Sequence, residues 1–402
     1  MGCCQKKTKK QKINDNDTNE IREPMVEDKE IQLRENSQDS NNSENDNIIE
    51  KISYDDFIKI KLLGTGSFGK VLLVRLKRNN KLYAMKILSK IFLKNRHQEE
   101  HTKTERDLMV SINSPFVVNI KFAFQDTSNL YIVTEFMQGG DMFYHLHDIG
   151  KFSAERAKFY IIELTLALES LHKKNMVYRD LKPENILMDN KGHIKITDFG
   201  LSKILENQDD KTYTLCGTPQ YLAPEILAKK GYDKNIDWWS LGCFLYEMLT
   251  GCLPFNIPRD EPLRVSLFTK EVKFPKGFDK QTKDFIKKLL VANPLKRLGS
   301  QDDYLSIKSH PYFQGIDWKK YEKREVKPPY VPVFSDELDL RYFDKLFTDE
   351  DITSTKSNLK QRSRIQSVYK DFTFISDSLK NNDENSNEKE GNIFNGENEY
   401  DE

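Results

Sequence analysis

The sequence predicts an α+β fold of two lobes: a small, antiparallel, β-rich lobe with one main helix, followed by a larger and mainly helical lobe. Three observations support this prediction. Short runs rich in β-branched and aromatic residues occupy 57–133, and apolar residues recur at three- and four-residue spacing from 154 to 172. Polar segments punctuated by Gly and Pro connect the later helical stretches. We expect a cleft between the two lobes.

The small lobe is predicted between residues 54 and 135. Its expected strands are mostly antiparallel and are the apolar runs FIKIKLLG, KVLLVRL, LYAMKIL and LYIVTEF. One helix, from about Glu99 to Ile112, interrupts them, and its apolar residues lie only toward its end. The large lobe is predicted between about 140 and 313. The spacing of buried helices is found there in AERAKFYIIELTLALESLH, DWWSLGCFLYEMLTG and QTKDFIKKLLVA.

The composition limits the classes of function. With 402 residues, the chain suffices for one large domain or two medium ones. Its 63 basic and 63 acidic residues balance, so no overall positive field favours nucleic acid, and we expect no nucleic-acid partner. Five cysteines with neither a disulfide framework nor metal-ligand spacing indicate a reducing compartment. We therefore expect a cytoplasmic protein without a secretory signal or a membrane-spanning helix.

Both ends of the chain are poor in apolar residues. Residues 1–50 begin with a basic stretch and continue as an acidic one rich in Asn and Ser, and residues 377–402 are rich in Asn, Asp and Glu. Because such segments bury little apolar surface, we expect a disordered arm at 1–50 and a disordered acidic tail at 377–402. Between 314 and 376 the chain is extended and Pro-rich, then polar, and ends in the aromatic cluster YKDFTF.

A glycine-rich segment, LGTGSFGKV, occupies residues 63–71. Glycine lets the backbone turn tightly and approach a ligand, so that backbone amides can bind phosphate oxygens. A strand follows this segment, whereas a helix would follow it in a dinucleotide-binding βαβ unit. The pattern therefore favours a β-hairpin lid over phosphates, with an ordinary Gly-rich hairpin as the alternative.

A lysine stands inside the apolar strand YAMKIL. An ammonium group in such a strand is costly unless an acid pairs with it. Glu105, on the predicted helix, is the candidate partner of Lys86, and the pair can hold the lysine against phosphates. The alternative is that Lys86 extends its ammonium group to solvent.

Two polar segments, YRDLKPEN and ITDFG, gather the groups that phosphoryl transfer needs. Asn185 and Asp198 offer the hard oxygen ligands that Mg²⁺ prefers. Asp180 can orient a hydroxyl group and take its proton, and Lys182 can stabilise the transferring phosphoryl group. Taken singly, each residue has another interpretation: Asp180 as a turn residue and Asp198 as a helix cap. The joint occurrence of the four residues in this order favours phosphoryl transfer.

Together these motifs resemble those of the eukaryotic protein kinases, over about Tyr54 to Phe313 and more weakly to Ser376. The resemblance implies the two-lobed protein kinase fold, with ATP and Mg²⁺ as cofactors. It makes Asp180 the catalytic base, Asn185 and Asp198 the metal ligands, and Lys182 a contact of the γ-phosphate. The residues that it implies around ATP are Leu63, Gly64, Thr65, Gly66, Ser67, Phe68, Gly69, Val71, Ala84, Lys86, Glu105 and Glu135.

The branch that the sequence resembles is that of the AGC serine/threonine kinases. Tyr178 replaces the family's usual His before Arg-Asp, as is common in that branch, and KTYTLCGTPQYLAPE is similar to its activation segment. Thr214 lies where the branch carries an activating phosphate; a plain loop hydroxyl is the alternative. The cations implied to bind that phosphate are His101, Arg179 and Lys203. Other resemblances are a stacked spine at Met109, Ile120, Tyr178 and Phe199 and a structural ion pair between Glu225 and Arg297.

Residues 314–376 resemble the C-terminal extension of AGC kinases. YKDFTF is similar to its closing hydrophobic motif, with Tyr369 in place of the usual first Phe. The resemblance implies that these aromatic residues fill a groove beside the Glu105 helix and that a phosphate on Thr373 fixes them there. Thr355 lies near the turn-motif phosphosite. A stray aromatic cluster in a polar tail is the alternative.

The expected substrates are proteins with Arg two or three residues before a Ser or Thr. DFGLSK, GTPQYLAPE and Lys182 favour these acceptors over Tyr. Asp141, Glu184 and Glu247 match positions that attract such arginines by pairing with their guanidinium groups. We also expect an upstream activating kinase and a monomer, and a regulatory subunit stays open. Two rival classes are a scaffold that keeps the fold but signals by docking and a small-molecule kinase.

The N-terminal segment MGCCQKKTKK suggests attachment to lipid. Gly2 can accept myristate, Cys3 and Cys4 can accept palmitate, and the lysines that follow favour an anionic membrane surface. Lys6 departs from the motif, which prefers Ser or Thr there. We expect a tether to the cytoplasmic face of a membrane, with a disordered basic start as the alternative.

Overall fold

The computed structural model describes residues 52–66, 69–207, 210–255, 271–350, 369 and 371–380. Several predictions concern residues outside these ranges: the glycine-loop residues Ser67 and Phe68, the turn-motif Thr355, and the lipidation residues Gly2, Cys3 and Cys4. Within the described ranges, none of the helices has the length and apolarity needed to cross a bilayer.

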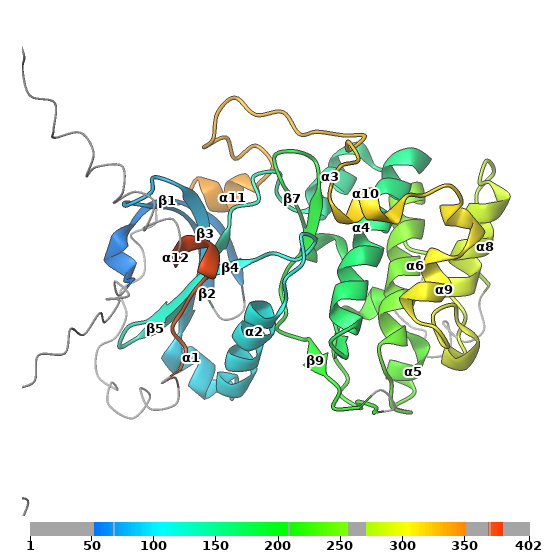
Figure 1. Ribbon diagram of the computed structural model, residues 1–402, viewed down its shortest axis with the longest axis horizontal. Helices are drawn as coiled ribbons and strands as arrows, with labels where there is room; N and C mark the ends of the chain where they lie inside the picture. Colours follow the sequence, from blue (N-terminus) through cyan, green and yellow to red (C-terminus); the bar gives the residue numbers. More distant parts are fainter. Residues whose placement is uncertain are drawn as a thin grey trace, which may run out of the picture. The chain divides into compact units, whose positions relative to one another are not determined.

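A six-stranded sheet in the order β1-β2-β3-β5-β4-β10 forms the small lobe, and every neighbouring pair is antiparallel (Figure 1). Its strands are β1 (Phe57–Gly66), β2 (Gly69–Leu76), β3 (Leu82–Ser89), β4 (Ile120–Gln125), β5 (Asn129–Glu135) and β10 (Phe374–Ile375). The predicted antiparallel lobe is therefore confirmed. The sixth strand comes from the C-terminal end of the described chain.

The helices of the small lobe follow β3. They are α1 (Lys90–Asn95) and α2 (Glu99–Ser111), and α2 matches the one main helix that the sequence predicts. Most of α2 is polar, and the residues that it buries are Thr102, Glu105, Leu108 and Met109. A buried glutamate among apolar neighbours requires a cationic partner, which is described with the site below.

The large lobe is helical, as predicted. Its helices are α3 (Met142–Ile149), α4 (Ala154–His172), α5 (Pro224–Leu227), α6 (Asn235–Thr250), α8 (Lys280–Leu289), α9 (Tyr304–Lys308) and α10 (Trp318–Glu322). α4 begins where the hydroxyl of Ser153 accepts a hydrogen bond from the amide of Arg156, and α6 ends at Gly251 in the left-handed conformation. Both helices are almost wholly buried, so they form the centre of the lobe.

Short elements complete the described chain. Single turns of 3₁₀ helix are η1 (Tyr54–Asp56), η2 (Pro183–Asn185), η3 (Pro219–Tyr221), η4 (Pro294–Lys296) and η5 (Pro311–Phe313). Two-stranded pairs are formed by β6 (Met176–Val177) with β9 (Lys203–Ile204) and by β7 (Ile186–Met188) with β8 (Ile194–Ile196). The segment YRDLKPEN lies between β6 and β7, and Asp198 follows β8. These pairs therefore hold the two polar segments side by side.

The structural ion pair implied by the sequence is present in the large lobe. Two guanidinium nitrogens of Arg297 lie 2.7 and 2.8 Å from the two carboxylate oxygens of Glu225. Both side chains are buried, and the paired geometry satisfies charges that would otherwise be costly there. In the same core, the rings of Tyr178 and Phe199 are 5.6 Å apart.

The ordered C-terminal segment extends past the boundary at Ser376 that the sequence predicts. Residues Asp377–Lys380 form α12, and α11 (Lys345–Thr348) packs against β1. The amide of Ser376 donates to the carbonyl of Lys121, and Leu379 packs on the apolar cluster of the sheet. These contacts explain why the first residues of the acidic tail are ordered.

Candidate active site

The ion pair predicted for Lys86 is present. Its Nζ lies 2.8 Å from Oε1 of Glu105 on α2 and 4.0 Å from Oδ1 of Asp198. Burial alone would lower the pKa of Lys86, but the nearby carboxylates of Glu105 and Asp198 raise it above its ordinary value. The ammonium group is therefore charged and fixed between the two lobes.

The strand register places further predicted residues beside Lys86. Val71 on β2 is directly opposite Lys86 on β3. Ala84 lies two residues before Lys86, so both side chains are on the same face of the strand. Leu63, Val71 and Ala84 are half-buried, while their neighbours Leu62 and Met85 are buried in the sheet core. The half-buried face is thus the one available to a ligand.

The glycines of the predicted phosphate loop differ in the space around them. A Cβ at Gly64 would meet nothing within 4 Å, and at Gly66 the nearest atom would be 4.0 Å away. At Gly69 a Cβ would lie 1.8 Å from the carbonyl oxygen of Ile87. Gly69 is therefore required by the packing of β2 on β3. Gly64 and Gly66, with the exposed Thr65 between them, leave open space beside the hairpin.

Asp180 is held by side chains from two segments. Its Oδ2 accepts hydrogen bonds from Lys182 and Asn185, both at 2.8 Å, and its Oδ1 accepts one from Thr218 at 2.9 Å. Lys182 also donates to the hydroxyl of Thr218 at 3.0 Å. The carboxylate is 7% exposed and has one orientation. Sequence reasoning missed Thr218, although GTPQYLAPE contains it.

The oxygens expected to hold a metal fit Mg²⁺. Asn185 donates through its amide nitrogen to Asp180, which leaves its side-chain oxygen as the group able to bind a cation. Asp198 adopts a left-handed backbone (φ 58°), and its side chain is 52% exposed. Among the described residues no cluster of three or more His, Cys, Asp or Glu side chains could enclose a metal. Mg²⁺ suits such an open pair, because it keeps waters and substrate phosphates as ligands.

The side chain of Glu135 is bound within the protein. Its Oε1 accepts hydrogen bonds from the amide of Asn119 at 2.9 Å and from Lys195 Nζ at 2.7 Å. The carboxylate is therefore used to join β5 to its neighbours.

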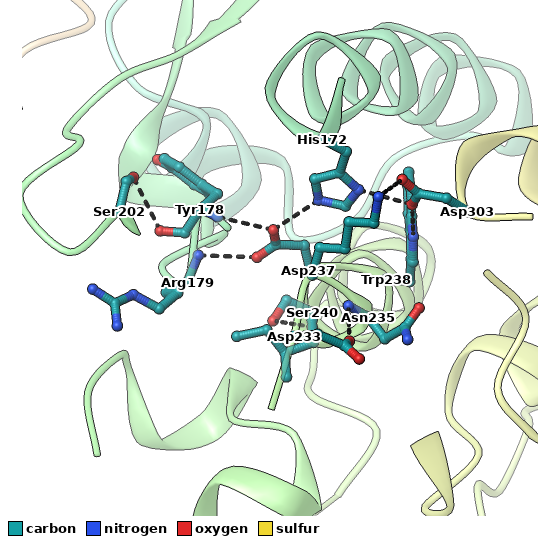
Figure 2. Close-up of polar contacts among 12 residues, drawn as sticks. His172, Tyr178, Arg179, Ser202, Asp233, Asn235, Asp237, Trp238, Ser240 and Asp303 are labelled. Carbon is teal, nitrogen blue, oxygen red and sulfur yellow. Dashed lines mark hydrogen bonds and ion pairs between the residues drawn. The ribbon is translucent and has the colours of Figure 1, made fainter. Parts of the chain in front are cut away.

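A buried carboxylate on α6 binds the backbone of the expected catalytic loop, residues 178–185 (Figure 2). Asp237 accepts hydrogen bonds from the backbone amides of Tyr178 and Arg179, each at 2.9 Å, and its Oδ2 also lies 2.9 Å from Nε2 of His172. Arg179 has φ 72°, so these amides are held in an uncommon backbone conformation. The sequence signal was an aspartate at the start of the stretch DWWSLGCFLYEMLTG, in the first turn of α6, which sequence reasoning did not interpret.

His172 lies between two carboxylates. Its Nδ1 is 2.9 Å from Oδ1 of Asp303, which also accepts a hydrogen bond from the indole of Trp238 and forms an ion pair with Lys234 (Figure 2). Burial lowers the pKa of His172, but its hydrogen bonds to Asp237 and Asp303 outweigh this and raise the pKa to about 9. Because both ring nitrogens face carboxylates, both are donors and the ring is cationic.

The segment around Thr214 is tied to the catalytic loop. The exposed Thr214 accepts, through its carbonyl, a hydrogen bond from the hydroxyl of Tyr232 at 2.7 Å, and Arg179 donates to that hydroxyl at 3.3 Å. Lys203 donates to Thr212 at 3.3 Å. Two of the predicted phosphate partners thus reach this segment. Among the described residues, no hydrogen bond joins the exposed His101 to it.

The charge of Glu184, in the segment YRDLKPEN, acts on two other acidic side chains. Burial raises the pKa values of Asp141 and Glu247, and the charge of Glu184 raises both further. Asp141 also begins α3, since its Oδ1 accepts a hydrogen bond from the amide of Tyr144 at 2.8 Å. The carboxylate of Glu247 accepts a hydrogen bond from the hydroxyl of Tyr221. The repulsion from Glu184 indicates a region that would be stabilised by a cation.

The aromatic residues of the C-terminal motif are buried against the small lobe. Tyr369 and Phe372 are both fully buried, and the carbonyl of Tyr369 accepts a hydrogen bond from Gln125 at 2.5 Å. The guanidinium group of Arg106 on α2 lies 5.5 Å from the ring centroid of Phe372. Thr373 is exposed between this groove and β10. The tail therefore contacts the helix that carries Glu105.

This arrangement, a β-rich lobe that carries a lysine–glutamate pair and a helical lobe that carries the aspartates, defines the protein kinase class. The comparisons with known proteins agree. The protein kinase domain model matches residues 57–313, and the protein kinase C terminal domain model matches residues 335–374. The chain belongs to the protein kinase family, within its AGC serine/threonine branch.

Several curated relatives are similar over most of this chain. Serine/threonine-protein kinase sck2 of Schizosaccharomyces pombe is 46% identical, over 80% of this chain and 52% of the relative. Serine/threonine-protein kinase YPK2/YKR2 of Saccharomyces cerevisiae is 44% identical, over 81% of this chain and 48% of the relative. The RAC family serine/threonine-protein kinase homolog of Dictyostelium discoideum is 41% identical, over 82% of this chain and 74% of the relative. The chain spans about half the length of the first two relatives.

The hydroxyl of Tyr369 generates a testable prediction. It is buried and has no hydrogen-bond partner among the described residues, which costs on the order of 1–3 kcal/mol. In the Tyr369→Phe protein the tail is therefore expected to bind the small lobe more tightly. Amide exchange in β10 should become slower. The midpoint of thermal unfolding should rise by about 2–4 °C for each kcal/mol gained.

Tyr83→Phe is the matched control for this substitution. The hydroxyl of Tyr83, in the same lobe, accepts a hydrogen bond from Asn79 at 3.1 Å, so its removal brings no such gain. Faster exchange in β10 of the Tyr369→Phe protein would show that the hydroxyl supports tail binding.

Proposed function

We propose that this protein transfers the γ-phosphate of ATP to Ser or Thr hydroxyl groups of other proteins. The observation that carries the proposal is the position of Lys86, paired with Glu105 from one lobe and facing Asp198 from the other. This arrangement brings a fixed cation to the open face beside the glycine hairpin. A nucleotide's phosphates are the ligand that such a cation and such a hairpin suit.

The side chains take separate roles in this proposal. Asp180 orients the acceptor hydroxyl and takes its proton, since its own hydrogen bonds fix its direction. Lys182 stabilises the charge of the phosphoryl group as it moves. Asn185 and Asp198 would hold Mg²⁺, which neutralises phosphate charge when bound.

The acidic residues support a preference for basic substrates. Glu184 raises the pKa values of Asp141 and Glu247, so an arginine between them would relieve repulsion as well as form ion pairs. We propose substrates with Arg two or three residues before the acceptor. We also propose that an upstream kinase phosphorylates Thr214, and further phosphates on Thr373 and Thr355 belong to the same proposal.

Transfer of phosphate from ATP, with Mg²⁺, to a peptide that has Arg three residues before Ser tests the proposal. The wild-type protein is expected to phosphorylate it, and Asp180→Asn is expected to lower the rate by roughly 10²–10⁴-fold because the proton acceptor is lost. Asp302→Asn, the same change at an exposed position of the large lobe, is the control and should leave the rate unchanged. The occupancy of Thr214 by phosphate is measured in each sample by mass spectrometry.

The same assay separates the rival classes. A docking scaffold would show no transfer even with Thr214 phosphorylated. A small-molecule kinase would label no peptide and would consume ATP only when a small-molecule acceptor is added. For substrate preference, Glu184→Gln should raise the KM of the Arg peptide while leaving the KM of its Ala-substituted form unchanged. Equal effects on both peptides would remove the arginine assignment.

A membrane tether is a separate proposal that rests on the sequence alone. Gly2, Cys3 and Cys4 precede a lysine-rich stretch, and one acyl chain plus a second chain or basic residues gives stable anchoring. Gly2→Ala is expected to move the full-length protein from the membrane fraction to the soluble fraction of a cell lysate. If mutant and wild type fractionate equally, Gly2 carries no anchor.

A further inference from the structure

Strand β8 contains a buried lysine to which the proposed function gives no role. Lys195 lies in the middle of β8, three residues before Asp198, and is 5% exposed. Its Nζ lies 2.7 Å from Oε1 of Glu135, the last residue of β5. A buried ammonium group is costly unless an acid compensates its charge. Here the acid comes from the small lobe, whereas the lysine belongs to the large one.

The carboxylate of this pair is fixed within the small lobe. Oε1 of Glu135 also accepts hydrogen bonds from the backbone amide and the side-chain amide of Asn119, at 2.9 and 3.3 Å. The backbone amide of Glu135 donates in turn to the carbonyl of Asn119 at 3.3 Å. One carboxylate oxygen therefore joins the end of β5, the residue before β4 and the ammonium group of Lys195.

The lysine of the pair belongs to the strand that carries the expected metal ligands. Asp198 follows β8 after one residue, and β8 pairs with β7, which begins directly after Asn185. The amide of Thr197, between β8 and Asp198, donates to the carbonyl of Asn185 at 3.0 Å. Both metal ligands are thus bound to β8, so a shift of β8 relative to the small lobe would move them together.

Residues 116–118, which lead into β4, attach β8 to the small lobe at a second place. The amide of Ile196 donates to the carbonyl of Phe116, and the amide of Val118 donates to the carbonyl of Ile196, both at 2.9 Å. These backbone bonds hold β8 beside the start of β4. The ion pair adds a contact between β8 and the end of β5, so the two attachments together limit how β8 can turn.

The ion pair connects the two charged groups that face each other across the lobes. On the small-lobe side, Lys86 of β3 is paired in register with Ile132 of β5, three residues before Glu135. On the large-lobe side, Lys195 precedes Asp198 by three residues. Nζ of Lys86 and Oδ1 of Asp198 lie 4.0 Å apart. The path through β5, the ion pair and β8 therefore helps to fix that separation.

We propose that Lys195 is a positioning residue that couples the binding of Mg²⁺ to the binding of the nucleotide. By holding β8 against the end of β5, it keeps Asn185 and Asp198 at a fixed separation from Lys86. This inference rests on the proposed function. Loss of Lys195 then leaves binding of the metal-free nucleotide intact and reduces the extent to which Mg²⁺ strengthens it.

The test measures binding of a fluorescent, non-hydrolysable ATP analogue to the full-length protein, once with Mg²⁺ and once with a chelator. The Kd without metal divided by the Kd with Mg²⁺ is the metal enhancement. Lys195→Met, which keeps an unbranched side chain without the charge, is expected to lower the metal enhancement by about 3- to 10-fold. The Kd without metal should stay within about twofold of wild type, because Lys86 and the glycine hairpin are unchanged.

Lys308→Met is the matched control. Nζ of Lys308, on α9, lies 2.9 Å from Oε2 of Glu169 on α4, and both side chains are largely buried. This variant loses a lysine–glutamate pair of the same kind within the large lobe, so it should keep the metal enhancement of the wild type. The midpoint of thermal unfolding is measured for both variants to show that they are folded.

A double variant tests whether the contact with Glu135 carries the effect. Lys195→Met combined with Glu135→Gln should lower the metal enhancement no further than Lys195→Met alone, because the two changes remove one contact. A clear further loss in the double variant would mean that Lys195 does not act through Glu135, and the inference would be wrong.

The remaining outcomes separate this inference from the proposed function. If Lys195→Met keeps the metal enhancement of the wild type, the inference is wrong and the proposed function stands. If the wild type binds no ATP analogue, the proposed function falls and the inference falls with it. Equal losses of binding with Mg²⁺ and with the chelator in Lys195→Met would indicate general structural damage and would also reject a positioning role.

Discussion

The geometry of the candidate active site depends on one buried carboxylate, Asp237. It accepts hydrogen bonds from the backbone amides of Tyr178 and Arg179, and the residue that follows them is the proposed catalytic base. An isolated carboxylate in this core would be destabilised by desolvation. The charge is compensated by His172, which is itself paired with Asp303 from a different helix. The backbone before Asp180 is thus held by Asp237 beside the loop, while Lys182 and Asn185 of the loop itself, together with Thr218, hold its carboxylate.

Three kinds of contact connect the lobes and the C-terminal tail. The ion pair of Lys86 with Glu105 belongs to the small lobe, and its neighbour Asp198 belongs to the large one. Strand β10 and the buried Tyr369 bring the C-terminal tail to the small lobe beside α2. Nearer the site, Phe343 of the same tail stacks on Phe136, the residue after Glu135. The tail therefore contacts both the small lobe and the segment that follows β5.

Much of this structure could be predicted from local sequence. Helix α4 has the predicted bounds, because its apolar spacing is regular and Ser153 caps it. The partner of Lys86 could be named, because a lysine in an apolar strand requires an acid and Glu105 lies on the main helix predicted for the small lobe. The role of Asp237 could not be predicted, since its partners are backbone amides and a histidine that lie far away in the sequence. The side-chain contact of Glu135 with Lys195 is likewise tertiary and leaves no local signal.

The titration of His172 tests the central claim most directly. The Cε1 signal of His172, one of seven histidines, is assigned by its loss in His172→Gln and followed by NMR from pH 5 to 10. With a folded pKa of about 9 against about 6.5 when unfolded, the ring should stay cationic at neutral pH. Its stabilisation, roughly 3 kcal/mol, is complete below pH 6.5 and lost as the pH rises through 9. A midpoint at or below 6.5 would contradict the charge-paired support of the catalytic loop.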